Sequence, residues 1–264
     1  WVKSCVTFPC SMVDRITPRS TDTLQRDVES LFGVSPIAPV MAEDFLQWVV
    51  EDNFAGERPN LSEVGVTFTK NVDPYEEAKI RILNGGHTCL TYLGALAGHH
   101  TFDQAMTDPV LFAHFEEFER NEVLPALTET LPFDKSEYLD QIIARFKNAS
   151  IGDTVERICA DGFLKFPIFI RPTLLGCLSQ GILPRAGLRA IASWYVFCKH
   201  IEAGKLPIKY AEPYWNNMRA LLSDDQLEAF ASSASLWGEI PQKYPEFTPK
   251  LMAAIREMDM KWPV

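Results

Sequence analysis

The pattern of hydrophobic residues changes abruptly near Pro74, and this change limits the folds that the chain can adopt. Before it, short apolar pieces are broken by prolines, and apolar residues at every second position of 64–68 have the period of a half-buried strand. After it, apolar residues recur at helical spacing, and no strand of comparable weight follows. We therefore predict a mainly α protein. Residues 1–74 would be the strand-containing end of an α/β domain, and residues 75–264 an all-helical domain.

Local signals place the helix starts. Asp108 followed by Pro109 is an N-cap and first-turn signal, which predicts a helix through residue 119. Ser136 is predicted to cap the next helix, and Asp153 to open one that ends near residue 167. The remaining helices are predicted at residues 22–31, 75–96, 184–203, 223–237 and 248–260.

Composition excludes several classes of protein. Hydrophobic residues make up 47% of the chain and charged residues 23%, which is typical of a globular protein and not of a disordered one. The 35 acidic residues outnumber the 25 basic ones, and a net charge of -10 argues against nucleic-acid or anionic-membrane binding. The six cysteines lack metal or redox spacing, and no signal peptide is visible. We therefore expect a cytoplasmic protein with reduced thiols.

Two familiar catalytic patterns are poorly supported. Tyr195 and Lys199 have the Y-x-x-x-K spacing of short-chain dehydrogenases, but no glycine-rich nucleotide turn precedes them, so we interpret them as part of a helix core. His99, His100 and Asp103 cluster in the sequence without the spacing of a helical zinc motif. We predict no metal site.

The segment 75–88 carries the most informative polar residues. The 100° step of an α-helix would place four of them within an arc of about 140°: Glu76, Lys79, Asn84 and His87. An amine, an amide and an imidazole on one face could form an acid–base site. A salt-bridged helix face is the alternative.

A second polar stripe lies further along the chain. Arg157, Asp161 and Lys165 are each four residues apart, which would place them on one helix face. Solvated ion pairs would explain that spacing, yet apolar residues surround the stripe. Both interpretations stay open from spacing alone.

The motif Lys79-x4-Asn84-x2-His87 resembles the signature of the polyol-specific long-chain dehydrogenases, the mannitol 2-dehydrogenase family. That family includes D-arabinitol 4-dehydrogenase and the fructuronate and tagaturonate reductases. Blocks at 8–18, 51–59 and 145–165 are similar to further family motifs in the same order, and the resemblance covers about residues 5 to 175. Ala149 departs from the pattern, which commonly has proline there.

The resemblance implies a Rossmann-type nucleotide domain followed by a helical substrate domain like the C-terminal domain of 6-phosphogluconate dehydrogenase. Residues 1–74 would be the tail of the Rossmann-type domain, and the rest of it would precede Trp1. NAD or NADP would bind mainly in that missing part. The chain alone would then be inactive.

The resemblance also assigns roles in catalysis. Lys79 would be the general base, which must be neutral to act, and burial or nearby cations would lower its pKa. Asn84 would donate a hydrogen bond to the developing alkoxide, and His87 would orient the substrate or the lysine. Glu76 would relay protons. No metal is implied.

Four further residues would bind the substrate by resemblance: Val13, Asp14, Arg157 and Lys165. The expected substrate is a secondary alcohol of a linear polyol, such as mannitol or D-arabinitol, which is oxidised to a ketose. A hexuronate reductase is the alternative, in which Arg157 and Lys165 would meet a carboxylate. A non-catalytic helical scaffold is a second alternative.

Overall fold

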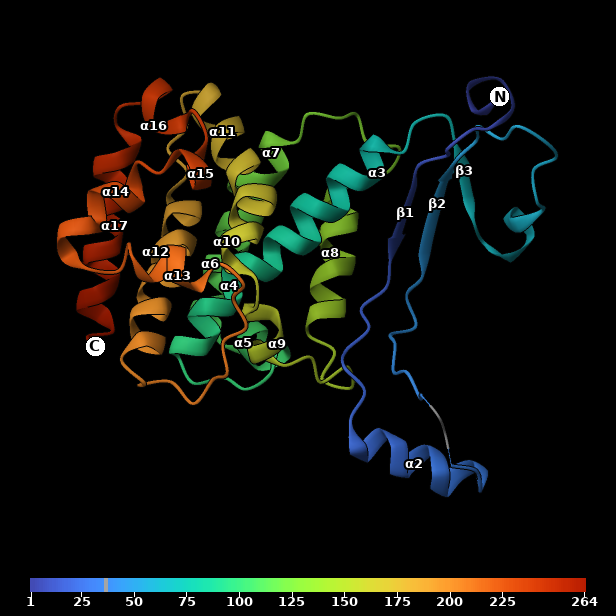
Figure 1. The fold of residues 1–264 in the computed structure, drawn as a ribbon, viewed down its shortest axis with the longest axis horizontal. Helices are drawn as coiled ribbons and strands as arrows, with labels where there is room; N and C mark the ends of the chain where they lie inside the picture. Colours follow the sequence, from blue (N-terminus) through green and yellow to red (C-terminus); the bar gives the residue numbers. More distant parts are fainter. Residues whose placement is uncertain (36–37) are drawn as a thin grey trace. The chain divides into compact units, whose positions relative to one another are not determined.

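A computed structural model describes residues 1–35 and 38–264 (Figure 1). The chain divides into two compact units, each described here by itself. The first comprises Trp1–Lys79, Glu129–Pro132 and Ser150–Gly152, and the second comprises Ile80–Thr128, Phe133–Ala149 and Asp153–Val264. Within the described ranges every strand lies before residue 75 and the rest is mainly helical, so the predicted fold class is confirmed.

The first unit contains a three-stranded sheet of β1 (Ser11–Asp14), β2 (Gln47–Glu51) and β3 (Thr67–Thr69) in that order. β1 runs antiparallel to β2, and β3 runs parallel to β2. A small core of Met12, Val49 and Val72 packs beneath it.

Short helices accompany this sheet: α1 (Val2–Cys5), α2 (Asp22–Phe32) and the 3-10 turn η1 (Leu61–Val64). The helix predicted at 22–31 is confirmed; the Thr21 side chain caps its start, and Gly33, at φ 65°, follows its last residue. The strand predicted at 64–68 is wrong in its first half. Gly65 adopts φ 90°, a left-handed conformation that ends η1, so pairing begins only at Thr67.

The helix predicted at 75–96 is three elements: α3 (Asp73–Ala78), the π-helical η2 (Lys79–Asn84) and α4 (Gly85–Leu96). α4 is buried on nearly all sides. A Cβ atom on Gly86 would lie 2.8 Å from the Phe115 ring and 2.8 Å from the Glu119 carboxylate. This glycine therefore permits close packing.

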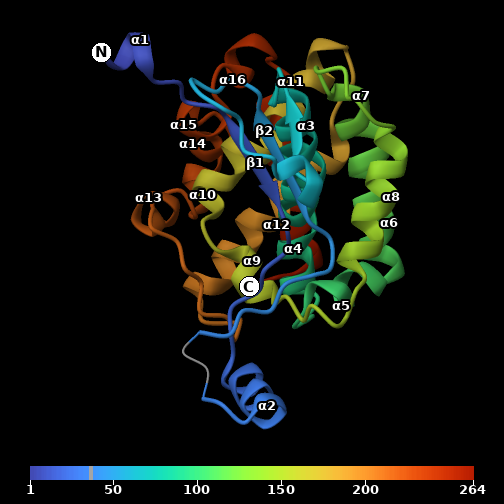
Figure 2. The same cartoon turned by 90° about the vertical axis from the view of Figure 1, so that its right-hand side faces the viewer.

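Next along the second unit come α5 (Phe102–Thr107), α6 (Pro109–Phe118), the π-helical η3 (Glu119–Val123), α7 (Leu124–Ala126) and α8 (Lys135–Phe146). In Figure 2, α6 and α8 lie at the right and α5 below them. Phe102 on α5 and Phe115 on α6 contact Phe146 on α8, with their ring centroids 5.0 and 6.0 Å from that of Phe146. The predicted start of α6 is confirmed, because Asp108 Oδ1 accepts from the first-turn amides. The predicted Ser136 cap is wrong. Asp134 caps α8 instead, accepting from the Ser136 amide at 2.8 Å.

The single helix predicted from Asp153 to residue 167 is also wrong. The chain forms α9 (Val155–Cys159), α10 (Gly162–Lys165), the π-helical η4 (Phe166–Ile170) and α11 (Arg171–Ser179). Asp161 breaks the run, since it adopts φ 61° and donates its amide to the Ala211 carbonyl at 2.9 Å. A left-handed residue cannot continue an α-helix.

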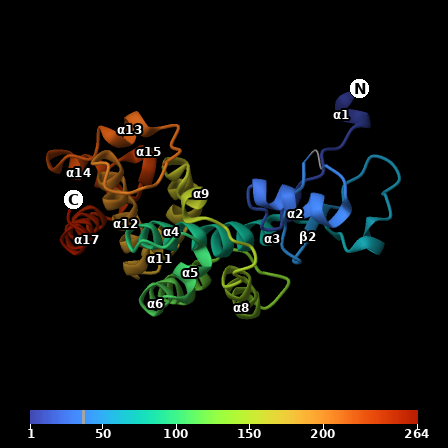
Figure 3. The same ribbon diagram turned by 90° about the horizontal axis from the view of Figure 1, so that it is seen from below.

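The long helix α12 (Arg185–Glu202) lies between α4 and α17 (Phe247–Lys261) (Figure 3). Both α12 and α17 match the predicted helices. The helix predicted at 223–237 is instead split into η5 (Asp224–Gln226), α14 (Leu227–Ala231) and α15 (Ala234–Trp237). The short helices α13 (Trp215–Arg219) and α16 (Ile240–Lys243) complete the unit. In the described part of the chain, no helix is both long and apolar enough to cross a membrane.

Candidate active site

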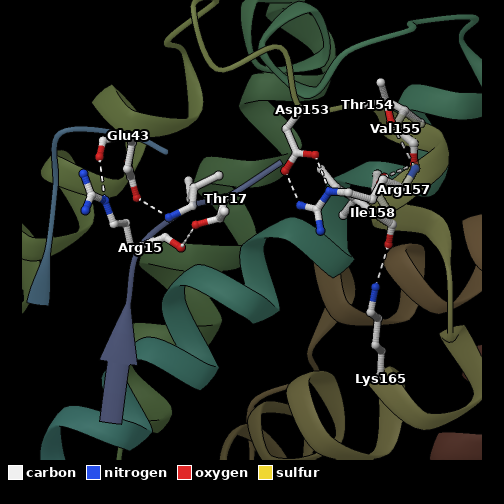
Figure 4. A network of polar contacts seen from close by, with 11 residues as sticks. Arg15, Thr17, Glu43, Asp153, Thr154, Val155, Arg157, Ile158 and Lys165 are labelled. Atoms are coloured by element: carbon white, nitrogen blue, oxygen red, sulfur yellow. Dashed lines mark hydrogen bonds and ion pairs between the residues drawn. The ribbon is translucent and has the colours of Figure 1, made fainter. Parts of the chain in front are cut away.

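The predicted site residues are distributed over both units. In the first unit, β1 carries Val13 and Asp14, and strand alternation puts them on opposite faces: Asp14 is buried and Val13 is 55% exposed. The chain that follows β1 is held by the buried Glu43. Its side chain accepts the Ile16 amide at 2.6 Å, and its carbonyl accepts Arg15 Nε at 2.8 Å (Figure 4).

Lys79 and Asn84 are the first and last residues of the π-helical segment η2. The arc expected from a uniform α-helix is therefore wrong. In an α-helix, residues five apart differ by about 140° around the axis. In a π-helix, hydrogen bonds join residues i and i+5, which brings such residues nearly into line. Lys79 is half-buried, and Glu76 is exposed on α3.

The side-chain oxygen of Asn84 is buried, and no described residue forms a hydrogen bond with it. A buried amide oxygen without a protein partner costs stability, so a water or ligand that donates to it would stabilise this position. His87 lies one turn further, on α4. Its ring stacks on Phe146 at 4.1 Å between centroids and meets the edge of Phe102 at 4.6 Å. These aromatic contacts fix the plane of the imidazole.

Arg157 and Lys165 lie in the same part of the second unit, but they are not brought together by helical spacing as the sequence suggested. The Arg157–Asp161–Lys165 stripe is wrong, because Asp161 breaks the helix. Instead, Lys165 Nζ donates to the carbonyl of Ile158, the residue after Arg157, at 2.8 Å (Figure 4). Burial lowers the pKa of Lys165, and the nearby Asp161 carboxylate opposes that shift. Two cationic side chains therefore converge on α9.

Asp153 is a functional candidate that the sequence analysis missed. Both of its oxygens accept from Arg157, through Nε and Nη2 (Figure 4). It does not open α9 as predicted, since Thr154 is the N-cap and accepts the Arg157 amide at 3.2 Å. The signal that could have revealed the pair was its i,i+4 spacing.

The remaining candidates have structural partners. Tyr195 donates to the Leu221 carbonyl at 2.9 Å, and Lys199 forms an ion pair with Asp259 at 2.7 Å, as expected of a helix core with its lysine directed outward. His99 Nε2 lies 3.4 Å from Asp108. Over residues 1–35 and 38–264, no group of three or more His, Cys, Asp or Glu side chains could hold a metal ion.

Comparisons with known proteins cover nearly the whole chain. Residues 71–259 match the family model "Mannitol dehydrogenase C-terminal domain", and residues 1–63 match "Mannitol dehydrogenase Rossmann domain". The D-arabinitol 4-dehydrogenase of Ralstonia nicotianae is 39% identical over 91% of this chain and 52% of its own length. The mannitol 2-dehydrogenase of Cereibacter sphaeroides is 36% identical over 97% of this chain and 55% of its own.

A solved structure gives the same picture. The mannitol 2-dehydrogenase of Pseudomonas fluorescens, in a ternary complex with NAD and D-mannitol, superposes with a TM-score of 0.89 at 33% identity. The match covers 99% of this chain and 54% of that one. The chain thus spans about half the length of the relatives it matches.

Proposed function

The chain belongs to the mannitol dehydrogenase family, and from that premise we propose that it forms the substrate-binding part of an NAD(P)-dependent polyol dehydrogenase. The reaction would oxidise a secondary alcohol of a linear polyol to a ketose, and reduce the ketose in reverse. Residues 1–74 would complete a Rossmann-type domain and residues 75–264 would form the substrate domain. The observation that best supports this proposal is the placement of Lys79 and Asn84 at the two ends of one π-helical segment. π-Helical segments are rare in proteins, and those that do occur often lie at functional sites.

In this proposal Lys79 is the general base that takes the proton from the substrate hydroxyl. Asn84 donates from its amide nitrogen to the oxygen that becomes negatively charged. The buried Asn84 oxygen has no hydrogen-bond partner in the described part of the chain, so this end of the amide can accept a hydrogen bond from a ligand. A bound nicotinamide supplies the hydride acceptor.

In the described part of the chain, the two connections that lead from a strand into an α-helix do not fit the phosphates of a dinucleotide. Phosphate binding in a Rossmann-type fold uses a glycine-rich turn between a strand and a helix. The connections 15–21, between β1 and α2, and 70–72, between β3 and α3, contain no glycine. We assign the dinucleotide to residues outside this chain, and we expect the chain alone to be inactive.

The other predicted residues would bind and orient the polyol. Arg157 and Lys165 would donate hydrogen bonds to its hydroxyls, and the Asp14 carboxylate would accept one from a hydroxyl. The backbone of Val13 would add a further contact. His87, packed against two phenylalanine rings, orients the substrate or Lys79. The exposed Glu76 relays protons to solvent.

The test measures NADH and NADPH oxidation with D-fructose, D-xylulose, D-fructuronate and D-tagaturonate. It uses the extended enzyme, which is this chain with a Rossmann-type half supplied from upstream coding sequence or from the Ralstonia relative. Lys79→Ala and a chelator-treated sample run beside it. Ketose reduction that survives the chelator and collapses in Lys79→Ala supports the proposal. Preferred reduction of the uronates would favour a hexuronate reductase, and no turnover would favour a scaffold.

A further inference from the structure

We propose that Asp153 determines substrate class, by compensating the charge of Arg157 so that the site accepts uncharged polyols and disfavours carboxylates. The inference rests on the proposed function and concerns its substrate-binding cations. It assigns to Asp153 a positioning and specificity role without contact to the reacting atoms.

The Asp153 side chain is 6% exposed, while that of Arg157 is 33% exposed. Both carboxylate oxygens of Asp153 accept from Arg157, and no other described side chain bonds to them. Its backbone is also fixed, since its carbonyl accepts the Phe102 amide at 2.9 Å. The carboxylate is therefore a rigid, buried negative charge against one edge of a guanidinium that is itself partly exposed.

Hydrogen-bond donors remain in spite of this pairing. A guanidinium has five N–H groups. Two of them, one on Nε and one on Nη2, donate to Asp153. The Lys165 ammonium gives one hydrogen to the Ile158 carbonyl and keeps the others. A polyol hydroxyl needs such donors and brings no charge of its own.

A substrate carboxylate has a different requirement. It loses hydration on binding and needs an uncompensated cation to offset that loss. Next to Arg157 it would meet the fixed negative charge of Asp153, and like charges in a partly buried site repel. Asp153 also acts on Lys165. Burial and Arg157 lower the pKa of this lysine, while the carboxylates of Asp161 and Asp153 raise it. Two acids therefore balance the two cations.

The decisive variant is Asp153→Asn in the extended enzyme, which keeps the size of the side chain and removes its charge. We expect the ratio of kcat/KM for D-fructuronate to kcat/KM for D-fructose to rise about tenfold or more. The change should lie mainly in KM for the uronate, because binding is altered and the chemistry is not. Asp153→Glu should restore the wild-type ratio. Asp225→Asn, which removes the same charge from the exposed turn η5, should leave the ratio unchanged.

An unchanged ratio in a folded Asp153→Asn enzyme would overturn the inference. If that variant does not fold, inhibition of the wild type decides. D-Mannitol should inhibit fructose reduction at a concentration at least about tenfold lower than D-mannonate, and equal inhibition would also overturn the inference. A wild type that reduces none of these ketones refutes the proposed function itself. A wild type that reduces fructose without the expected shift refutes the role of Asp153 alone.

Discussion

A methyl group at Gly162 should destabilise the fold beside Arg157 and Lys165, the two cations that we propose to bind substrate. Gly162 is the first residue of α10 and lies between Arg157 and Lys165 in the chain. A Cβ atom there would lie 2.7 Å from the hydroxyl oxygens of Tyr92 and Tyr210 and would also collide with Trp194 Nε1. Real Cβ atoms do not approach other atoms this closely, so Gly162→Ala requires the surrounding rings to move.

Those rings have little freedom to move. Tyr92 and Trp194 are fully buried, and Tyr92 donates to the Cys159 carbonyl at 2.8 Å. Trp194 donates to the Tyr210 hydroxyl at 3.1 Å, which in turn donates to Glu212 at 3.0 Å. Overpacking a core by one methyl costs about 1–3 kcal/mol, and a displaced hydrogen bond adds about 1 kcal/mol. The higher helix propensity of alanine offsets at most about 1 kcal/mol of this loss. With all three contributions the net loss is about 1–3 kcal/mol.

Urea unfolding followed by tryptophan fluorescence measures this loss. The matched control is Gly94→Ala in α4, where the added Cβ would lie 3.0 Å from one side-chain atom, Ala105 Cβ, and 3.8 Å from the next. We expect Gly94→Ala to lie within about 1 kcal/mol of wild type. If Gly162→Ala is as stable as Gly94→Ala, the ring cluster is not rigid and the reasoning is refuted.

Three further predictions concern buried or capping charges in the second unit. Burial raises the pKa of Glu119 well above its usual value, so the folded state retains a proton that the unfolded state loses above about pH 4.5, and stability falls as pH rises. Glu119→Gln should therefore gain stability relative to wild type from pH 5 to 8, and parallel curves in urea would count against this. Burial lowers the pKa of His114 to about 3, so wild type should lose up to about 1.4 kcal/mol per pH unit below pH 6.5. His114→Gln should lack that slope in the same titration. Asp108→Ala removes the cap of α6 and should lower the free energy of unfolding by about 1 kcal/mol at neutral pH. The loss should be smaller below about pH 3.8, because amide hydrogen bonds lower the pKa of Asp108 and their contribution fades as this carboxylate is protonated. Equal losses at pH 7 and pH 3 would contradict this.

Local chemistry predicted the elements whose ends are fixed by adjacent residues. Asp108 and Pro109 together specify the start of α6, and the apolar period of α12 continues without interruption over its whole length. Where two cap-forming residues stood close together, the sequence did not decide between them. Asp134 and Ser136 can both accept first-turn amides, and Asp134 is the one that does.

The errors occur where distant residues determine the backbone. Asp161 adopts a left-handed backbone conformation, and its amide donates to the carbonyl of Ala211, fifty residues further along the chain. The π-helical segments η2, η3 and η4 have no apolar period of their own in the sequence, so the α-helical period was extended through them.

The same limit applies to the candidate site. A motif was enough to select Lys79, Asn84 and His87, but the unpaired Asn84 oxygen and the aromatic contacts of His87 depend on tertiary packing. The Asp153–Arg157 pair had a sequence signal that was assigned to a helix start instead. The motif therefore selects candidate residues, and tertiary packing determines the contacts that hold them.

The measurement that tests the central claim most directly is chemical rescue of Lys79→Ala in the extended enzyme. If Lys79 is the general base, kcat/KM for D-mannitol oxidation should fall by about 10²–10⁴-fold. Added methylamine or ethylamine should then restore turnover in proportion to the concentration of the free base, while leaving the wild type unaffected. Full activity in Lys79→Ala would contradict the account. So would a folded, inactive variant that binds polyol as the wild type does and that no amine restores.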